Sequence, residues 1–385
     1  GNVTLNDVAT AGITLDTLEA DANVILTAAG DTAITNDAAL ALQGAVTGTL
    51  AATATTGGIT DSSNLSATGN VTLNDVATAG ITLDTLEADA NVILTAAGNT
   101  AITNDAALAL QGAVTGTLAA TATTGDITDS DTLTVSGASV FTLGADGSNI
   151  ILDSAANAFS GAVTLKAGSS GSQTFGNIVF VDSGAIDFDS AASADGDLFL
   201  DGGTDNTVGG TLSVTATAGG ITDSATIAVT GDLTLNDVAT AGITLDTLEA
   251  DANVILTAAG DTAITNDAAL ALQGAVTGTL AATATTGGIT DSSNLSATGN
   301  VTLNDVATAG ITLDTLEADA NVILTAAGDT AITNDAALAL QGAVTGTLAA
   351  TATTGGITDS SNLSATGNVT LNDVATAGIT LETLL

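Results

Sequence analysis

The hydrophobic positions of the chain fall in short runs with a two-residue spacing. Val3 and Leu5 flank a threonine, and Val24 and Leu26 repeat the same spacing. Residues two apart in a β-strand point to the same face of a sheet. Glycine, aspartate, asparagine and serine separate the runs, and these residues favour tight turns. The pattern therefore predicts many short strands joined by turns, each with one face toward a core.

The same pattern returns along the chain at a fixed period. The segment GNVTLNDVATAGITL begins at Gly1, Gly69, Gly299 and Gly367, and a near copy begins at Gly231. The intervals 69−1, 299−231 and 367−299 all equal 68. We expect one continuous solenoid over 1–385, because stacked repeats share one core. Its predicted parts are repeats 1–68, 69–136, 231–298 and 299–366, a divergent solenoid insert at 137–230, and a partial repeat at 367–385.

A shorter period divides each repeat. The intervals between the successive valines Val3, Val24, Val46 and Val71 are 21, 22 and 25, which together make one repeat. Three such subrepeats predict coils of about 22–23 residues, three coils per 68-residue repeat and about 17 coils in all. Three apolar marks per coil predict a three-sided parallel β-helix (β-solenoid) of the all-β class. Parallel connections favour right-handed winding.

A helical solenoid is the alternative fold. The segments LDTLEADANVIL and TNDAALALQGAV contain good helix formers, and nearby Asp and Asn can cap helices. The density of threonine and glycine favours strands, and a solenoid helix would lack Lys or Arg for side-chain pairs four residues apart. The absence of proline also favours strands, because every strand residue must donate its N–H to a neighbouring coil.

Composition excludes several classes of function. The 385 residues include 42 acidic side chains and one basic one, Lys166, for a net charge of −41, and no His, Cys, Met, Pro, Trp or Tyr. Zinc, copper and haem sites need His, Cys or Met, and most catalytic acids, bases and nucleophiles are missing. Binding to nucleic acid needs Lys or Arg. No apolar run approaches the ~18 residues of a membrane span. We therefore expect no enzyme, no nucleic-acid partner and no membrane insertion.

The acidic residues are the main candidates for a site. In the first repeat they are Asp7, Asp16, Glu19, Asp21, Asp31, Asp37 and Asp61. Asp16, Asp37 and Asp61 each follow an Ile-Thr pair, so neighbouring coils are expected to stack them ~5 Å apart. Stacked carboxylates repel, which leaves two hypotheses: calcium bound at the stacked Asp turns, or a solvated face with counter-ions. The segments GADGSN at 144–149 and DGGTDN at 201–206 suggest calcium, but no complete calcium-binding motif is present.

Three further features have a structural and a functional interpretation. Thr14, Thr35 and Thr60 could form an ice-binding array, but an outward threonine ladder that stiffens a sheet is the simpler prediction. Asn2 and Asn64 begin glycosylation sequons, which chance also explains in this composition, and Asn2 and Asn23 could stack as a turn ladder. Lys166 and all six phenylalanines lie in the insert. They could form a local core with a lysine on the surface, or a contact patch for a neighbouring chain. No catalytic, cofactor-binding or metal-ligating residue is assigned.

Several segments resemble a known family. GDLTLNDV, NAFSGAVTL, GGTLSVTATAGGITDS and LSATGNVTL resemble the repeats of large β-solenoid bacterial surface proteins, the filamentous-haemagglutinin and autotransporter-passenger type of adhesin. The resemblance implies an extracellular, non-enzymatic fibre subunit or stalk at the cell surface. Its partners would be itself, by end-to-end or lateral assembly, or further repeats of a longer chain. The alternative that it implies is an adhesin that recognises a glycan or the surface of a host or neighbouring cell.

Overall fold

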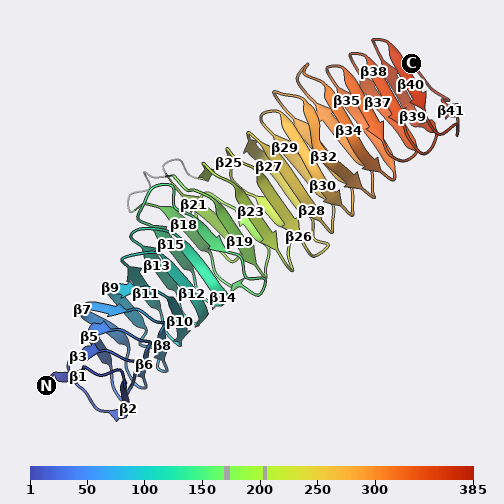
Figure 1. Cartoon of the computed structure of the whole chain (residues 1–385). Coiled ribbons are helices and arrows are strands. Elements are labelled where there is room, and N and C mark those ends of the chain that lie inside the picture. Colours follow the sequence, from blue (N-terminus) through green and yellow to red (C-terminus); the bar gives the residue numbers. More distant parts are fainter. Residues whose placement is uncertain (169–173, 203–205) are drawn as a thin grey trace. The chain divides into compact units, whose positions relative to one another are not determined.

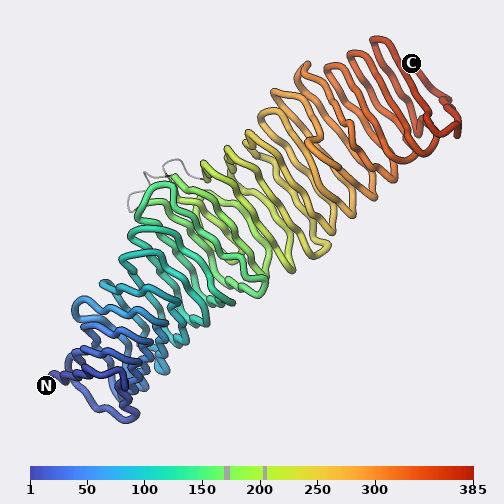
Figure 2. Tube along the Cα trace, in the orientation of Figure 1, coloured from blue at the N-terminus to red at the C-terminus, as the bar shows by residue number. Residues whose placement is uncertain are grey.

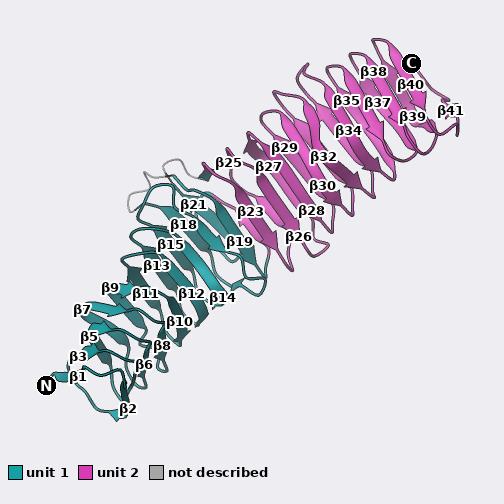
Figure 3. Ribbon diagram, in the orientation of Figure 1, with its two compact units in different colours: residues 1–184, 190–207 teal, residues 185–189, 208–385 magenta. Residues whose placement is uncertain are grey.

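The computed structural model describes residues 1–168, 174–202 and 206–385. The predicted fold class is confirmed: these residues form an all-β parallel β-solenoid of about 18 turns, without a helix (Figure 1). The chain divides into two compact units, and each is described by itself (Figure 3). Unit 1 contains residues 1–184 and 190–207, and unit 2 contains residues 185–189 and 208–385.

Consecutive strands alternate between two sheets. In the first repeat, β1 pairs in parallel with β3, which pairs with β5 and then β7, and we name this sheet A. The strands between them, β2, β4 and β6, form sheet B. One coil therefore has two strands, one in each sheet, and the tube in Figure 2 follows this back-and-forth path within unit 1. The strands are β1 (Val3–Asp7), β2 (Ile13–Leu18), β3 (Val24–Ala28), β4 (Thr32–Asn36), β5 (Leu40–Val46), β6 (Leu50–Ala54) and β7 (Ile59–Ala67).

The second repeat begins on the opposite sheet from the first. Its first strand, β8, has the same sequence as β1, VTLND, but pairs with β6 and β10 in sheet B. The reason is that residues 1–68 contain seven strands, an odd number, and each coil uses two. A repeat therefore makes 3.5 coils, and the next repeat starts on the other sheet. The second-repeat strands are β8 (Val71–Asp75), β9 (Ile81–Ala88), β10 (Asn91–Ala96), β11 (Thr100–Asn104), β12 (Leu108–Val114), β13 (Leu118–Ala122) and β14 (Ile127–Val135).

Unit 2 alternates in the same way. Three strands that begin successive repeats, β26, β33 and β40, lie in sheets B, A and B. Its strands are β20 (Ile186–Phe188), β23 (Leu212–Ala216), β24 (Ile221–Asp223), β25 (Ile227–Val229), β26 (Leu233–Asp237), β27 (Ile243–Ala250), β28 (Asn253–Ala258), β29 (Thr262–Asn266), β30 (Leu270–Val276), β31 (Leu280–Ala284), β32 (Ile289–Ala297), β33 (Val301–Asp305), β34 (Ile311–Ala318), β35 (Asn321–Ala326), β36 (Thr330–Asn334), β37 (Leu338–Val344), β38 (Leu348–Ala352), β39 (Ile357–Ala365), β40 (Val369–Asp373) and β41 (Ile379–Thr380). A short β22 (Thr207–Val208) lies at the unit boundary.

The predicted size and shape of a coil are wrong. We expected three sides, three coils per repeat and about 22–23 residues per coil. Val24 does lie above Val3, an interval of 21, but the next residue in that column is Leu42, an interval of only 18. A repeat of 3.5 coils averages about 19 residues per coil. The error arose from counting like residues, because Val46 pairs with Ala28 and Ala67 and does not stack on Val24.

The core is a narrow stack of aliphatic side chains. Val24, Leu26 and Leu42 are at most 1% exposed, and full burial of such a side chain contributes about 1.5–3 kcal/mol. Gly44 allows neighbouring coils to approach closely. Its φ is +108°, and a Cβ there would lie 2.0 Å from the carbonyl oxygen of Leu26. Only glycine tolerates both conditions.

Larger side chains fill the part of the insert in unit 1. Phe141 and Phe159 meet edge to face at 5.9 Å between ring centroids, and Phe159 stacks on Phe180 at 5.3 Å. Lys166 forms a salt bridge to Asp201 at 2.5 Å across one coil. The phenylalanines thus agree with a local core, and the lysine is paired within the chain. The strands here are β15 (Ser139–Leu143), β16 (Ile150–Leu152), β17 (Ala158–Phe159), β18 (Val163–Ala167), β19 (Ile178–Asp182) and β21 (Asp197–Asp201).

Candidate functional site

A β-bulge of one kind recurs in β2, β9, β27 and β34. In β9, Leu83 pairs with Ile102 but Leu86 pairs with Asn104, so β9 has one residue more than β11 over this stretch. The extra residue leaves Asp84 and Thr85 both exposed, while Leu83 and Leu86 stay buried. Bulges turn side chains outward and interrupt the ladder of backbone hydrogen bonds. The two adjacent polar residues in LDTLEA are the sequence signal for it.

Asp61, one coil before, binds the backbone amides of this bulge. Its carboxylate accepts hydrogen bonds from Asp84 N at 2.9 Å, Thr85 N at 2.6 Å and Thr85 Oγ1 at 2.8 Å. The bulge is therefore held by an acidic side chain of the neighbouring coil. The equivalent carboxylates in other coils are Asp129, Asp223, Asp291 and Asp359.

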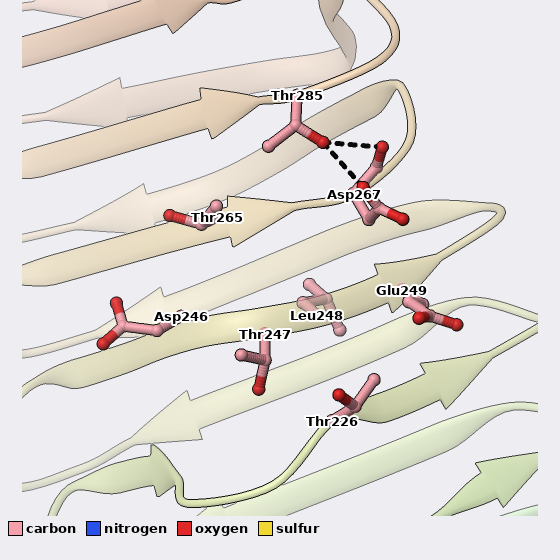
Figure 4. A pocket seen from close by; sticks show the side chains of 8 residues that line it. All are labelled: Thr226, Asp246, Thr247, Leu248, Glu249, Thr265, Asp267 and Thr285. Atoms are coloured by element: carbon pink, nitrogen blue, oxygen red, sulfur yellow. Dashed lines mark hydrogen bonds between the residues drawn. The ribbon is translucent and has the colours of Figure 1, made fainter.

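A shallow surface hollow lies beside each bulge. We name it the acidic hollow, and its volume is about 220 to 290 Å³ in the four copies. Figure 4 shows the copy along β27 in unit 2, where side chains from neighbouring coils surround it and Thr285 donates to Asp267 at 2.8 Å. The second-repeat copy is lined by Asn64, Asp84, Thr85, Leu86, Glu87, Thr103, Asp105 and Thr123. The counterparts in the first repeat are Asp16, Thr17, Glu19, Thr35, Asp37 and Thr55.

The acidic hollows alternate between the two sheets. In unit 1, the first hollow lies along β2 in sheet B and the second along β9 in sheet A. In unit 2, the hollows lie along β27 in sheet A and β34 in sheet B. Because a repeat has 3.5 coils, both faces of the solenoid carry the same chemical groups.

The structure changes the predicted aspartate column. Asp16 and Asp37 do line one hollow, but Asp61 lies in sheet A, where its neighbour is Asp84 of the next repeat. The expected single column of Asp16, Asp37 and Asp61 is therefore wrong. Asp84 and Asp105 line the second hollow, and Asp61 accepts the Asp84 amide, because the following repeat begins on the opposite sheet.

Hydrogen-bond donors offset much of the repulsion between carboxylates. Asp31 accepts the Thr49 amide at 2.8 Å, and this bond holds the pKa of Asp31 below its ordinary value. Asp261 and Asp329 have the same partner type and the same lowered pKa. Asp37 accepts the Thr55 hydroxyl at 2.9 Å. Among the described residues, no group of three or more His, Cys, Asp or Glu side chains is placed to hold a metal ion.

The other sequence candidates have structural partners. Asp146 of the segment 144–149 accepts the Thr174 amide at 2.8 Å, and residues 203–205 of the segment 201–206 lie outside the described residues. The prediction of a single ladder of Thr14, Thr35 and Thr60 is wrong. In sheet B, Thr14 pairs with Ala33 and Thr35 pairs with Thr53, whereas Thr60 lies in sheet A.

The asparagine ladder is present in the second repeat. Asn70 accepts the amide of Asn91 at 3.3 Å, and these residues are the counterparts of Asn2 and Asn23. The Asn64 sequon lies at the edge of a hollow.

Sequence reasoning missed the hydroxyl groups of the hollow. Thr17 and Thr55 line it together with the predicted acids, and they give it hydrogen-bond donors as well as acceptors. The hollow offers carboxylate, hydroxyl and asparagine groups, and no aromatic or basic side chain lines any of the four copies. Such a surface favours cationic or hydroxyl-rich partners and repels anions.

Comparison with known proteins gives one family. A family model described as repeats of unknown function matches residues 29–96, 97–166, 175–259, 259–327 and 327–384. Two of these segments include most of the insert, which is thus composed of the same kind of repeat. Neither the curated proteins nor the solved structures give a match. In the described part of the chain, no helix is long and apolar enough to cross a membrane.

Proposed function

Because the chain belongs to the family of repeats of unknown function (DUF5649) and folds as a repeat β-solenoid scaffold, we propose that it is an extracellular structural fibre subunit or stalk. The resemblance of its repeats to β-solenoid surface adhesins supports the extracellular, cell-surface location. Its partners in this proposal are copies of itself, by end-to-end or lateral assembly, or further repeats of the same chain.

The observation that carries the proposal is the parallel stacking of coils along the described residues of each unit. Val71 of β8 aligns with Leu50 of the coil before and with Val92 of the coil after, and the neighbouring positions follow the same register. Each inner coil is thus hydrogen-bonded on both sides. A structure of this kind gains length with every added repeat without a new fold, because each repeat contacts only its neighbours.

Charge and composition support a role without catalysis. The acidic hollows contain no His, Cys, Lys or Arg, and the net charge is −41. This charge opposes binding to nucleic acid and to anionic membranes, which share its sign. It also keeps parallel copies apart unless counter-ions bridge them. We therefore propose a mechanical role with neither nucleic-acid binding nor membrane insertion.

The experiment is electron microscopy of the full chain and of a variant in which residues 299–366 are duplicated in tandem. The added repeat contributes 3.5 coils, so the length along the coil axis should grow by about 17 Å. Protease or antibody access on intact cells of the source organism tests the extracellular location. A variant of unchanged length, or a protein protected inside intact cells, would overturn the proposal.

The acidic hollow favours an adhesin as the second candidate. Its copies repeat on both faces, so one chain would engage partners on opposite sides. Binding to neutral glycans and to cell surfaces tests it. The informative variant changes the four hollow glutamates to glutamine: Glu19, Glu87, Glu249 and Glu317. Its matched control changes four exposed aspartates outside the hollows to asparagine, which removes the same charge: Asp21, Asp89, Asp251 and Asp319. Loss of binding in the glutamine variant alone supports the adhesin, whereas equal binding by both variants contradicts it.

A further inference from the structure

Each inner repeat buries an aspartate oxygen that has no hydrogen-bond partner. Asp75 ends β8, is 1% exposed, and its Oδ2 accepts the Gly80 amide at 2.8 Å, while its Oδ1 has no partner. Asp237 and Asp305 have the same sequence position, the same 1% exposure and the same unpaired Oδ1. Buried polar atoms are nearly always hydrogen-bonded, so three identical exceptions require an explanation.

A buried threonine hydroxyl without a partner belongs to the same corner of each coil stack. Ala96 stacks on Asp75, and four residues later Thr100 begins β11, with its Oγ1 unpaired and 2% of the residue exposed. Thr262 and Thr330 have the same relation to Asp237 and Asp305, since the intervals 100−75, 262−237 and 330−305 all equal 25. Six of the eight unpaired atoms among the described residues thus occur in three pairs, one carboxylate oxygen and one hydroxyl per corner. Thr32 and Ser139 have no such pair, and the acid 25 residues before Thr32, Asp7, already accepts the Ala9 amide with its Oδ1.

Packing does not explain the threonine. In its column, Thr100 lies between Ile81 and Leu118, and Thr262 lies between Ile243 and Leu280. An apolar side chain would fit such a column. The residues on the aspartate side are small, because Asp75 stacks between Ala54 and Ala96. A polar residue in an apolar column, beside small neighbours and near a carboxylate, indicates a polar ligand in the corner.

We propose that each of these corners is a binding site for one internal water molecule. The water donates a hydrogen bond to the aspartate Oδ1 and forms a second hydrogen bond with the threonine hydroxyl. The sites are Asp75 with Thr100, Asp237 with Thr262, and Asp305 with Thr330. A buried water needs two to four polar partners. A calcium ion needs about six to eight oxygens, and each corner offers two free ones. Ser139, whose hydroxyl is also unpaired, has Val114 at the position that the acid takes in these pairs and is not such a site.

High-resolution diffraction from the full chain gives the direct test. We expect a density peak within about 2.7–3.2 Å of both oxygens in all three corners. Corners in which the threonine hydroxyl donates directly to the aspartate, or in which no peak is found, would overturn the proposal. Crystals soaked in thallium(I) distinguish water from a cation. Anomalous peaks at the corners would show that a monovalent cation, and not water, occupies them, and would overturn the proposal.

A solution experiment counts the sites independently. Oxygen-17 relaxation dispersion reports water molecules that stay inside a protein, and Thr262→Val should lower their number by one. Thr262→Ser keeps the hydroxyl and should keep the count. Valine fits the column between Ile243 and Leu280, so the variant is expected to fold, which circular dichroism checks. An unchanged count in a folded Thr262→Val protein contradicts the proposal.

Discussion

Asp61 and Thr85 lie one coil apart in sheet A, and the Asp61 carboxylate accepts the Thr85 amide at 2.6 Å. The bond makes an acidic side chain into a link between coils. In a chain with 42 acidic residues and one basic one, backbone amides take the place of missing cations. A carboxylate that accepts amide donors keeps its charge at a smaller cost than one that faces only its own kind.

Asp61→Ala should loosen the bulge without unfolding the coil. The amides of Asp84 and Thr85 lose a charged acceptor, worth about 1.5 kcal/mol, so their hydrogen exchange should accelerate about tenfold. Hydrogen exchange read by mass spectrometry measures this. Asp89→Asn, an exposed site outside the hollow, is the control for loss of one charge. Equal acceleration in the two variants would mean that charge, and not the bond, matters.

Gly44→Ala should be among the most damaging single changes in unit 1. The new Cβ would meet the Leu26 carbonyl oxygen at 2.0 Å and would stand on a backbone with φ +108°. Strain from such a backbone alone costs about 1–3 kcal/mol, and the clash adds to it. Gly147→Ala separates the two effects, because Gly147 has φ +71° and nothing within 4 Å of its Cβ position. In urea unfolding, Gly44→Ala should lower the free energy of unfolding more than Gly147→Ala does. The reverse order would exclude the clash as the cause of the destabilisation.

How much of this follows from sequence depends on the kind of feature. The 68-residue period and the two-residue alternation predicted the solenoid and many inward residues, such as Val24 and Leu26. The pairing between coils did not follow, because register depends on turn lengths and not on the recurrence of valine. The change of sheet between β1 and β8 needs only one fact, an odd number of strands per repeat. The assumption of three apolar runs per coil hid this odd number of strands.

The polar interior was available in the sequence but was not used. Thr32, Ile34 and Asn36 are two residues apart, so the alternation that buries Ile34 also buries the other two. Composition-based reasoning places asparagine at turns and therefore overlooks it. The hollow was half predicted: its acids stood out, whereas its threonines resembled ordinary strand residues.

Asn104→Asp should destabilise unit 1 strongly. Asn104 is fully buried, its Oδ1 accepts the Ala88 amide, and its Nδ2 donates to the carbonyls of Ala88 and Ala107. Aspartate cannot donate either bond and would bury a charge, at a cost of about 3 kcal/mol or more. The control is Asn99→Asp at an exposed corner, where the other repeats already have aspartate. The temperature of thermal unfolding should fall for Asn104→Asp and stay nearly constant for Asn99→Asp.

Acid should weaken the corners that depend on a charged acceptor. The Thr49 amide keeps the pKa of Asp31 below 3.8, so this bond contributes its full stability above pH 3.8 and loses it as the pH falls through the lowered pKa. The second repeat provides an internal control, because Asn99 accepts the Thr117 amide at 3.0 Å and does not titrate. Protection of the Thr49 amide, corrected for the intrinsic exchange rate, should fall as the pH drops below 3.8, whereas that of Thr117 should not. Equal behaviour of the two amides would contradict this prediction.

Salt should stabilise the chain without a preference for calcium. A net charge of −41 repels itself at low ionic strength, and the Debye length shrinks from about 30 Å at 0.01 M to 10 Å at 0.1 M salt. The melting temperature should therefore rise with sodium chloride. Because no described group of carboxylates is placed to coordinate a metal, Ca²⁺ and Mg²⁺ at equal concentration should raise it equally. A saturable increase with Ca²⁺ alone would reinstate the calcium hypothesis, and the variant with glutamine at Glu19, Glu87, Glu249 and Glu317 would then show whether the ion lies in the acidic hollows.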